Sequence, residues 1–526
     1  MIKTIEIVLL PEQAADRQIQ AEQAAGILSL PLSQIHALKI LKRSIDARSR
    51  QVKIRLRVEV FVNEDAPDEK NPAAFFDFKK DVSQSPNVLI AGFGPAGMFA
   101  ALRLIELGYC PIVLERGKDV RERRRDLAAI NKEGKINPDS NYCFGEGGAG
   151  TYSDGKLYTR SNKRGDIDRI LSILVMHGAD PDIRVDAHPH IGTNKLPQLV
   201  TAIRKTIEDA GGKILFNTKL TDILVRNDRI HAVRIQNTID QREEELSCES
   251  LLLATGHSAR DIFELLHRNK IEIEAKPFAI GVRIEHPQEI IDRVQYHCDV
   301  RGPFLPPASY ALTGQANDRG VYSFCMCPGG IIAPAATGEK EIVVNGWSPS
   351  KRNNPYANSG MVVSLDEKDF SEFKSAGALA GLRYQQQVEF NSWKAGQGNL
   401  QAPAQRLLDF LDKKKSPILP SCSYIPGITA AVLDDVLPQE IIQSLRSGIK
   451  IFGKKMPAYL TNEAVLVATE SRTSSPVRIP RDPETLQHIR VKGLFPCAEG
   501  AGYAGGIVSA AMDGERCAEA IAKRLR

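Results

Sequence analysis

The first sixty residues carry a regular pattern of apolar and polar positions. The segment VKIRLRVEVFV at 52–62 alternates apolar with mostly basic side chains, which predicts a strand with one buried and one basic face. TIEIVLL at 4–10 predicts another strand. Residues 14–30 and 31–49 show helical spacing, and Pro31 stands where a helix commonly begins. We therefore predict a small N-terminal α/β module over 1–80, which merges into a polar linker at 63–87.

The pattern changes at Asn87. The stretch NVLIAGFGPAGMFAALRLIELGYCPIVLERG predicts a strand, a loop, a helix and a second strand. Further on, residues 196–212 have helical spacing, and 213–225, 229–236 and 250–255 contain short apolar runs typical of strands. We assign these elements to one domain over residues 87–275.

Two further regions complete the predicted organisation. Residues 276–455 are richer in Pro, Gly and aromatic residues, with strand patterns at 278–285, 321–327 and 341–347, and we interpret them as an inserted second domain. Residues 456–526 end in one strand, one glycine-rich turn and one helix, and we predict that they return to the first domain. The sequence shows no internal repeat.

The motif GFGPAG at 92–97 stands between the predicted strand and helix. Gly92 permits a tight turn, Gly94 lets the backbone approach a pyrophosphate, and Gly97 allows close packing of the helix on the strand. The first helical amides then face the phosphates. Glu115 ends the second strand, where an acid accepts hydrogen bonds from a ribose and disfavours the 2′-phosphate of NADP. Together these features predict a dinucleotide site.

Three more stretches indicate which dinucleotide binds. They are GEGGAG at 145–150, LLLATG at 251–256 and PCAEGAGYAGGI at 496–507. In this order, after GFGPAG and its acid, they resemble the FAD-binding fold of the glutathione-reductase superfamily. The whole chain, including KRSIDAR at 42–48, resembles a bacterial group of uncharacterised FAD-dependent dehydrogenases, related to geranylgeranyl-reductase-like and fumarate-reductase-like flavoproteins. The resemblance implies a Rossmann-like FAD-binding domain of glutathione-reductase type with an inserted α+β substrate domain.

The resemblance also implies a set of FAD-binding residues. Glu499 would meet the ribitol hydroxyls, and the helix that starts near Gly506 and Ile507 would face the pyrimidine end of the flavin, where a helix N-terminus stabilises negative charge. The complete set of expected cofactor-binding residues is Gly92, Gly94, Pro95, Ala96, Gly97, Glu115, Arg116, Gly147, Gly148, Thr151, Ser153, Thr255, Gly256, Glu499, Gly500, Gly506 and Ile507.

The stretch EGAGYAGGI repeats the spacing of a dinucleotide fingerprint at Gly500, Gly502 and Gly505. After Gly506 only one helix follows, which leaves no room for a second strand or a ribose-binding acid. We therefore expect one dinucleotide site, with this stretch passing the flavin.

The composition constrains the partners and the cellular location of the protein more than it constrains the reaction. Lys and Arg number 69 against 64 Asp and Glu, a net charge of +5 that by itself implies no nucleic-acid partner. No signal peptide or membrane-spanning run is visible, and the nine cysteines are scattered and odd in number. The sequence predicts a cytoplasmic protein without membrane insertion, and the Cys and His spacings predict no metal site.

The sequence identifies few candidate catalytic residues, because flavin itself carries hydride and single electrons. We consider Arg472 as a holder of a substrate carboxylate or phosphate, Tyr503 as a proton donor beside the flavin, and Cys327 as a pocket thiol. A structural ion pair, ring packing and a core position are the alternatives for the three. NAD(P)H is a possible transient electron donor, and it would visit the substrate pocket because no second Rossmann unit is present.

The N-terminal module adds a second possibility. Eight basic residues lie between Lys39 and Arg57 against one acid, Asp46. We favour an FAD-dependent oxidoreductase that acts on a small molecule. A flavin-dependent RNA-modifying enzyme that uses this basic face, and a non-catalytic flavin sensor, remain as alternatives; a solvated charged face is the commoner meaning of such a run. The sequence does not define the oligomeric state.

Overall fold

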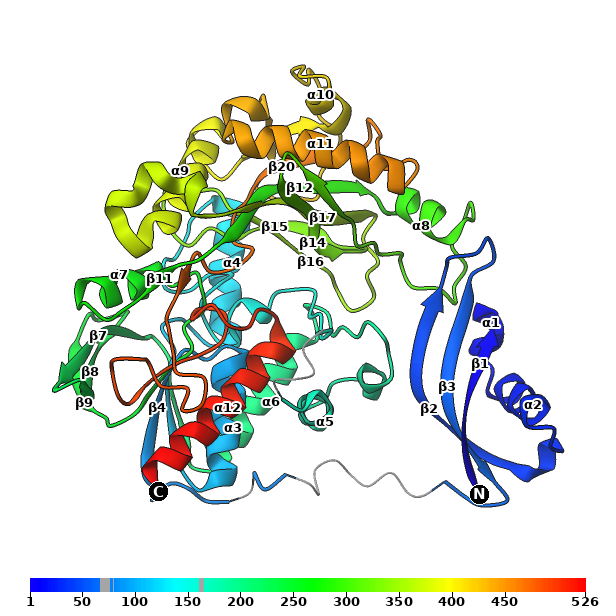
Figure 1. Cartoon of the computed structure of the whole chain (residues 1–526), viewed down its shortest axis with the longest axis horizontal. Coiled ribbons are helices and arrows are strands. Elements are labelled where there is room, and N and C mark those ends of the chain that lie inside the picture. The colour runs from blue at the N-terminus through cyan, green and yellow to red at the C-terminus, as the bar shows by residue number, and fades with distance from the viewer. Residues whose placement is uncertain (67–75, 79, 160–164) are drawn as a thin grey trace.

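The computed structural model describes residues 1–66, 76–78, 80–159 and 165–526. Part of the predicted linker, 67–75 and residue 79, lies outside the described residues. The N-terminal module stands beside the rest of the molecule (Figure 1). It forms a three-stranded antiparallel sheet in the order β1-β3-β2, with two helices. Its elements are β1 (Ile2–Leu9), α1 (Pro11–Ala14), α2 (Arg17–Leu28), β2 (Ile35–Asp46) and β3 (Lys53–Val62).

Strand β3 confirms its predicted alternation: Ile54, Leu56 and Val58 are buried, and Lys53 and Arg57 are exposed. The predicted helix over 31–49 is wrong, because this segment is strand β2. Strand β2 has two β-bulges against β3, and its exposed positions recur every third residue, at 36, 39, 42 and 45. That spacing imitates a helix. The basic run therefore lies on two paired strands and the turn between them, and not on a helix and a strand.

The Rossmann-like domain is built on a five-stranded parallel sheet in the order β22-β10-β4-β5-β6. The predicted strand–helix–strand unit is confirmed as β4 (Asn87–Ala91), α3 (Pro95–Leu107) and β5 (Cys110–Leu114). The remaining strands of the sheet are β6 (Lys213–Leu215), β10 (Leu251–Leu253) and β22 (Leu494–Pro496). The domain's other helices are α4 (Val120–Glu133), α5 (Ile167–Met176), α6 (Leu196–Asp209), α7 (Arg260–Arg268) and α12 (Ile507–Leu525).

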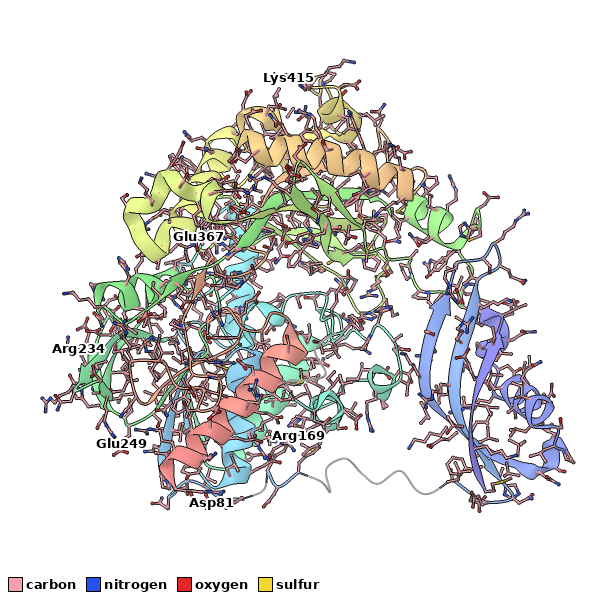
Figure 2. All side chains as sticks on the ribbon, viewed as in Figure 1. Asp81, Arg169, Arg234, Glu249, Glu367 and Lys415 are labelled. Atoms are coloured by element: carbon pink, nitrogen blue, oxygen red, sulfur yellow. The ribbon has the colours of Figure 1, made fainter. Side chains whose placement is uncertain are left out.

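Helices α3 and α12 lie side by side across the sheet (Figure 1). A Cβ atom at Gly514 of α12 would lie 2.1 Å from the carbonyl oxygen of Ala96, so glycine allows α12 to approach the first turn of α3. Arg169 of α5, labelled in Figure 2, donates to Glu515 of α12 from Nε over 2.9 Å. A small antiparallel sheet flanks the domain, made of β7 (Thr218–Arg226), β8 (Arg229–Asn237) and β9 (Glu243–Ser247).

The second domain carries a mixed seven-stranded sheet in the order β13-β14-β17-β12-β20-β18-β19. Helices α9 (Ala380–Ala395), α10 (Leu407–Leu411) and α11 (Gln439–Lys455) cover its outer face (Figure 1). Its strands are β12 (Phe278–Pro287), β13 (Thr313–Ala316), β14 (Arg319–Cys327), β17 (Tyr356–Leu365), β18 (Ala402–Arg406), β19 (Ile428–Ala430) and β20 (Val465–Glu470). Helix α8 (Gln288–Tyr296) and the pair β15 (Ile331–Pro334) and β16 (Val344–Trp347) complete it.

One predicted boundary shifts. Strand β20 pairs with β12 and β18 in the seven-stranded sheet, so that sheet continues beyond residue 455 before the chain returns to the first domain. The short pair β11 (Glu274–Ala275) and β21 (Val477–Arg478) runs where the chain leaves and re-enters the Rossmann-like domain. Within the described residues, no helix is both long and apolar enough to cross a membrane.

Candidate functional site

A cavity of about 300 Å³ opens where the carboxyl ends of the parallel strands β4, β5 and β10 meet. This is the end of a doubly wound sheet at which ligands bind. Loops between residues 143 and 156, the turn before α12 and Cys325 of the second domain complete its walls. The cavity therefore draws on both domains.

The loop between β4 and α3 forms the first wall. Gly92 has φ +101°, and a Cβ atom there would lie 2.4 Å from the carbonyl oxygen of Ala254, so only glycine fits. Gly94, Pro95 and Ala96 also line the cavity. Gly97 stands behind them, where a Cβ atom would lie 2.0 Å from the carbonyl oxygen of Gly92. The motif thus shapes a tight turn and a close helix start.

The start of α3 has no side-chain cap, since Gly94 is the N-cap residue and Pro95 follows it. The first amides of a helix lack partners within the helix, and the helix dipole adds partial positive charge there. An anion at this end of the cavity would receive those hydrogen bonds.

Glu115 and Arg116 follow strand β5 and line the cavity. Glu115 is buried, and its carboxylate accepts hydrogen bonds from the amides of Phe93, Gly117 and Gly145 over 2.9–3.0 Å. These bonds fix the carboxylate at the cavity edge. Arg116 pairs with Asp139 and Asp261 over 2.8 and 2.9 Å, and it lies against the ring of Phe144.

Only some of the residues predicted in the glycine-rich loop line the cavity. Gly148 and Ser153 line the cavity, and a Cβ atom at Gly148 would lie 3.2 Å from Cα of Gly94. Gly147 and Thr151 stand behind the lining. The Thr151 hydroxyl donates to the carbonyl oxygen of Glu146 over 2.8 Å, so it stabilises the loop.

Five more predicted residues line the same cavity, two after strand β10 and three near the start of α12: Thr255, Gly256, Glu499, Gly506 and Ile507. Gly500 packs against Gly256 and does not line the cavity. Helix α12 also starts without a side-chain cap, at Gly506 with φ +94°. Two uncapped helix starts thus border the cavity.

The three residues considered for chemistry lie outside the lining. Arg472 is buried among Glu389, Glu341 and Thr337, with its shortest bond, to Glu341, at 2.7 Å. Its guanidinium is engaged by these partners inside the second domain, which makes it part of an internal ion pair. Tyr503 accepts a hydrogen bond from the Arg481 amide, and its ring lies between two guanidinium groups, those of Arg478 and Arg481. Cys327 is completely buried.

Sequence reasoning missed the polar groups that do line this part of the cavity. Lys156, Asp154, Cys325 and His257 all contribute to the walls. Nζ of Lys156 lies 3.3 Å from Asp154, whose carboxylate also accepts from Arg352 over 2.6 Å. Nδ1 of His257 lies 3.5 Å from Glu499. Lys156 belongs to the same glycine-rich stretch as Ser153, and a charged residue within such a stretch was the available signal.

Charges fix the ionisation of this group. Burial raises the pKa of the Asp154 carboxyl, but Lys156 and Arg352 outweigh it and hold that pKa below its ordinary value. Burial lowers the pKa of Lys156, but the neighbouring sulfurs and Asp154 outweigh it, so the ammonium keeps its proton. The cavity therefore presents a fixed cation beside a fixed anion.

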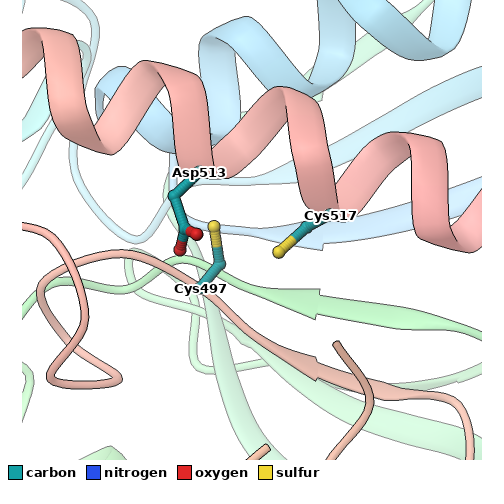
Figure 3. A group of neighbouring side chains, drawn as sticks. All are labelled: Cys497, Asp513 and Cys517. Atoms are coloured by element: carbon teal, nitrogen blue, oxygen red, sulfur yellow. The ribbon is translucent and has the colours of Figure 1, made fainter. Parts of the chain in front are cut away.

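Cys497, Asp513 and Cys517 gather below α12, close enough to share a metal ion (Figure 3). Asp513 is already bound by Arg481 over 2.6 and 2.9 Å and by the Ala498 amide. A guanidinium inside the cluster opposes a second cation. This cluster links the end of β22 to α12 and lies outside the cavity lining.

The residues around the cavity fit an FAD. The turn at Gly92 and the uncapped start of α3 suit a diphosphate, the fixed Glu115 carboxylate suits ribose hydroxyls, and the start of α12 suits an electron-rich ring. A glycine-lined approach without side chains leaves room for the backbone to contact the ligand.

Comparisons with known proteins agree with this fit. A family model described as "FAD-dependent protein, C-terminal domain-like" matches residues 277–473, and a domain of unknown function matches residues 1–61. An uncharacterized protein of Clostridium beijerinckii is 40% identical over 528 residues and covers 97% of each chain.

Solved structures are similar at low identity. A geranylgeranyl bacteriochlorophyll reductase-like protein of Thermoplasma acidophilum is 10% identical, with a TM-score of 0.36, over 84% of this chain and 79% of that one. Thermovibrio ammonificans THI4 is 16% identical, with a TM-score of 0.25, over 36% of this chain, which spans 66% of that protein's length. Because the Clostridium relative matches nearly the whole length, and the family model matches the second domain, this chain belongs to a family of uncharacterised FAD-dependent proteins, with FAD as its cofactor.

Proposed function

We propose that the protein is an FAD-dependent oxidoreductase, a dehydrogenase or reductase, that acts on a small molecule bound in the cavity. One observation carries this proposal. The same cavity is lined by the dinucleotide-type turn and by the ionised groups of Lys156 and Asp154 and the thiol of Cys325. A cofactor-only site has no need of such groups next to it. Bound FAD supplies the acceptance and release of hydride or single electrons.

The chain's own residues bind, orient and hold protons. The turn at Gly92 and the start of α3 would hold the diphosphate, and Glu115 would orient the ribose. The start of α12 at Gly506 borders the cavity and would stabilise negative charge on a reduced flavin bound beside it. The Lys156 ammonium offers a positive group, and a proton at Nζ, to an anionic or carbonyl substrate.

A nicotinamide donor, where one is used, would enter this same cavity. The described parts of the chain contain one parallel Rossmann-like sheet, so no separate nicotinamide domain accompanies it. A donor that is the substrate itself or another protein is the alternative.

The RNA-modifying alternative gains no support from the basic module. Arg43 pairs with Asp182 and Asp186, and Arg55 pairs with Asp46 and Glu6. Part of the positive charge of the module is therefore compensated within the chain.

The test is anaerobic mixing of the purified FAD-bound protein with NADH and NADPH in turn, followed by its visible spectrum. Bleaching by one of them supports a nicotinamide-dependent reductase. A flavin that stays oxidised with both, yet is reduced in the light with a sacrificial donor and reoxidised by small acceptors, supports a substrate or protein donor. Protein that neither purifies with FAD nor takes it up, or a flavin that no donor and no acceptor reaches, contradicts the proposal.

A further inference from the structure

Two thiols of the second domain meet one ammonium at the cavity wall. Nζ of Lys156 lies 3.7 Å from Sγ of Cys325 and 3.7 Å from Sγ of Cys327. Cys325 and Lys156 line the cavity, whereas Cys327 is completely buried behind them. The arrangement places an accessible sulfur in front of an inaccessible one.

The backbone of β14 is bent so that the two sulfurs converge. Its pairing with β17 is interrupted between Phe324 and Cys327, and Cys325 has φ +46°, a left-handed conformation that a non-glycine residue adopts at a cost. The Cys327 thiol lies 3.2 Å from the carbonyl oxygen of Cys325, so the bend is compact. An undisturbed strand would hold the two residues a full repeat apart.

A second cation faces the pair from behind. Arg283 is fully buried; it donates to the carbonyl oxygen of Cys325 over 2.7 Å, and its guanidinium lies 3.6 Å from Sγ of Cys327. It also pairs with the buried Glu470 over 2.7 Å, so its position is fixed.

These contacts shift the pKa values of the two thiols in opposite directions. A hydrogen bond from Cys327 and the charges of Lys156 and Arg283 hold the pKa of Cys325 well below its ordinary value, against the effect of burial. The pKa of Cys327 is raised well above its ordinary value, by that hydrogen bond and by burial. One thiolate and one thiol are the chemical requirements for disulfide formation.

We propose that Cys325 and Cys327 form a redox-active dithiol that exchanges two electrons with FAD in this cavity. The inference rests on the proposed function, since it needs a flavin that changes oxidation state. In the oxidising direction the S–H bond of Cys327 breaks and one S–S bond forms between the two sulfurs. The two electrons released reduce FAD to FADH₂, which takes up the proton from Cys327 and one proton from water. The reverse reaction returns the dithiol to reduce a disulfide or another two-electron acceptor.

The other described cysteines do not offer this arrangement. Cys497 and Cys517 lie near each other, but neither lines the cavity. Cys143 lines the cavity, and its thiol donates to the carbonyl oxygen of Ala335 over 3.7 Å.

The first measurement counts electrons in the holoprotein. Anaerobic titration with dithionite should consume about twice as many electrons per FAD in the wild type as in Cys325→Ser or Cys327→Ser. Cys248→Ser, which removes a thiol outside the cavity, should behave as the wild type. Equal electron counts in the wild type and in both cavity variants would overturn the proposal.

The second measurement identifies the sulfurs directly. Alkylation and peptide mass spectrometry of the air-oxidised holoprotein should show Cys325 and Cys327 joined and unalkylated, and both alkylated after reduction. Lys156→Met keeps both cysteines, so it should keep the wild-type electron count while iodoacetamide reacts with the reduced protein about tenfold more slowly at pH 7. Two alkylated thiols in the oxidised wild type would contradict a disulfide.

The outcomes separate the two proposals. A flavin that is not reducible by any donor defeats the proposed function and the dithiol together. A flavin that is reduced normally, with no additional electrons and no disulfide, leaves the oxidoreductase standing and removes only the dithiol.

Discussion

Gly92 and Gly178 have almost the same φ, +101° and +102°, but different surroundings. A Cβ atom at Gly92 would lie 2.4 Å from the carbonyl oxygen of Ala254, whereas one at Gly178 would meet nothing within 4 Å. The two positions therefore separate the cost of the conformation from the cost of the crowded turn. The first is about 1–2 kcal/mol for a residue with a side chain.

We predict that Gly92→Ala raises the Kd of FAD at least about tenfold, because about 1.4 kcal/mol of lost binding free energy corresponds to that change, and that it lowers the fraction of chains carrying FAD to the same extent when free FAD is below its Kd. Gly178→Ala should lose only the conformational term and keep its FAD. Flavin absorbance per chain measures the first effect, and thermal unfolding the second. A Gly92→Ala protein with a full complement of FAD would show that this turn does not hold the cofactor.

At the scale of residues, those that could be predicted from the sequence belong to local motifs, whereas those that were missed depend on contacts between distant parts of the chain. Gly92 and Gly94 carry their role in local spacing, because a strand and a helix flank them. Cys325 and Lys156 are 169 residues apart, and their meeting depends on the folding of the second domain over the first. No local pattern reports such a contact. Arg472 shows the converse, since its partner Glu389 lies 83 residues earlier and turns a candidate ligand-binding group into an internal ion pair.

At the scale of elements, a buried ion cluster ties α7 to α9 and to the segment after β20. Glu389 of α9 accepts from Arg260 of α7 over 2.6 Å and from Arg472 over 3.3 Å, and it is completely buried. Removing one charge from a buried cluster leaves its partners uncompensated, which costs about 3–5 kcal/mol.

We predict that Glu389→Gln lowers the free energy of unfolding by about 3 kcal/mol at pH 7, measured by urea titration. The matched control is Glu264→Gln, which removes an exposed pair with Arg383 and should cost at most about 1 kcal/mol. Equal costs for the two variants would show that the buried cluster does not tie the elements together.

The same cluster predicts a pH dependence. Burial raises the pKa of Glu389, but Arg260 and Arg472 outweigh it and lower the pKa to about 2. A carboxyl with a lowered pKa stabilises the folded state above its ordinary pKa of about 4.5, and this contribution is lost as pH falls toward 2. The difference in stability between wild type and Glu389→Gln should therefore be constant from pH 7 to about 5 and shrink below it.

The secondary-structure elements also show which parts of the fold can be predicted from the sequence. The parallel strands and α3 follow from apolar runs and a glycine turn, and they were predicted within a few residues. Strand β2 was not, because its exposed positions recur every third residue, a spacing close to that of a helix. The boundary after residue 455 was missed for another reason: the pairing of β20 with β12 joins residues almost two hundred positions apart.

At the scale of the whole molecule, a strand-like contact joins the N-terminal module to the Rossmann-like domain. The amide of Arg43 donates to the carbonyl oxygen of Val185 over 2.8 Å, and the amide of Ala187 donates to that of Arg43 over 2.9 Å. The Arg43 side chain adds bonds to Asp182 and Asp186 over 2.8 and 2.7 Å. The module is thus hydrogen-bonded to the segment of the chain that continues to Pro189 and His190.

That segment leads directly to the cavity. The amide of Leu157 donates to the carbonyl oxygen of Pro189, and Lys156 forms an isolated bridge with His190. The module therefore supports, through residues 182–190, the loop that carries the ammonium facing Cys325 and Cys327.

We predict that Arg43→Ala speeds hydrogen exchange at the amides of Ala187 and Leu157 by about tenfold, the change expected for a loss of about 1.4 kcal/mol in local stability. The matched control is Arg48→Ala, which removes an exposed side chain paired with Asp46 inside the module and should leave both amides unchanged. Exchange in the strands of the five-stranded sheet should stay slow in both variants, because Arg43 contacts none of them. Unchanged exchange at Leu157 with faster exchange at Ala187 would mean that the support ends before the cavity. Unchanged exchange at both amides would mean that the side chain of Arg43 does not hold the module in place.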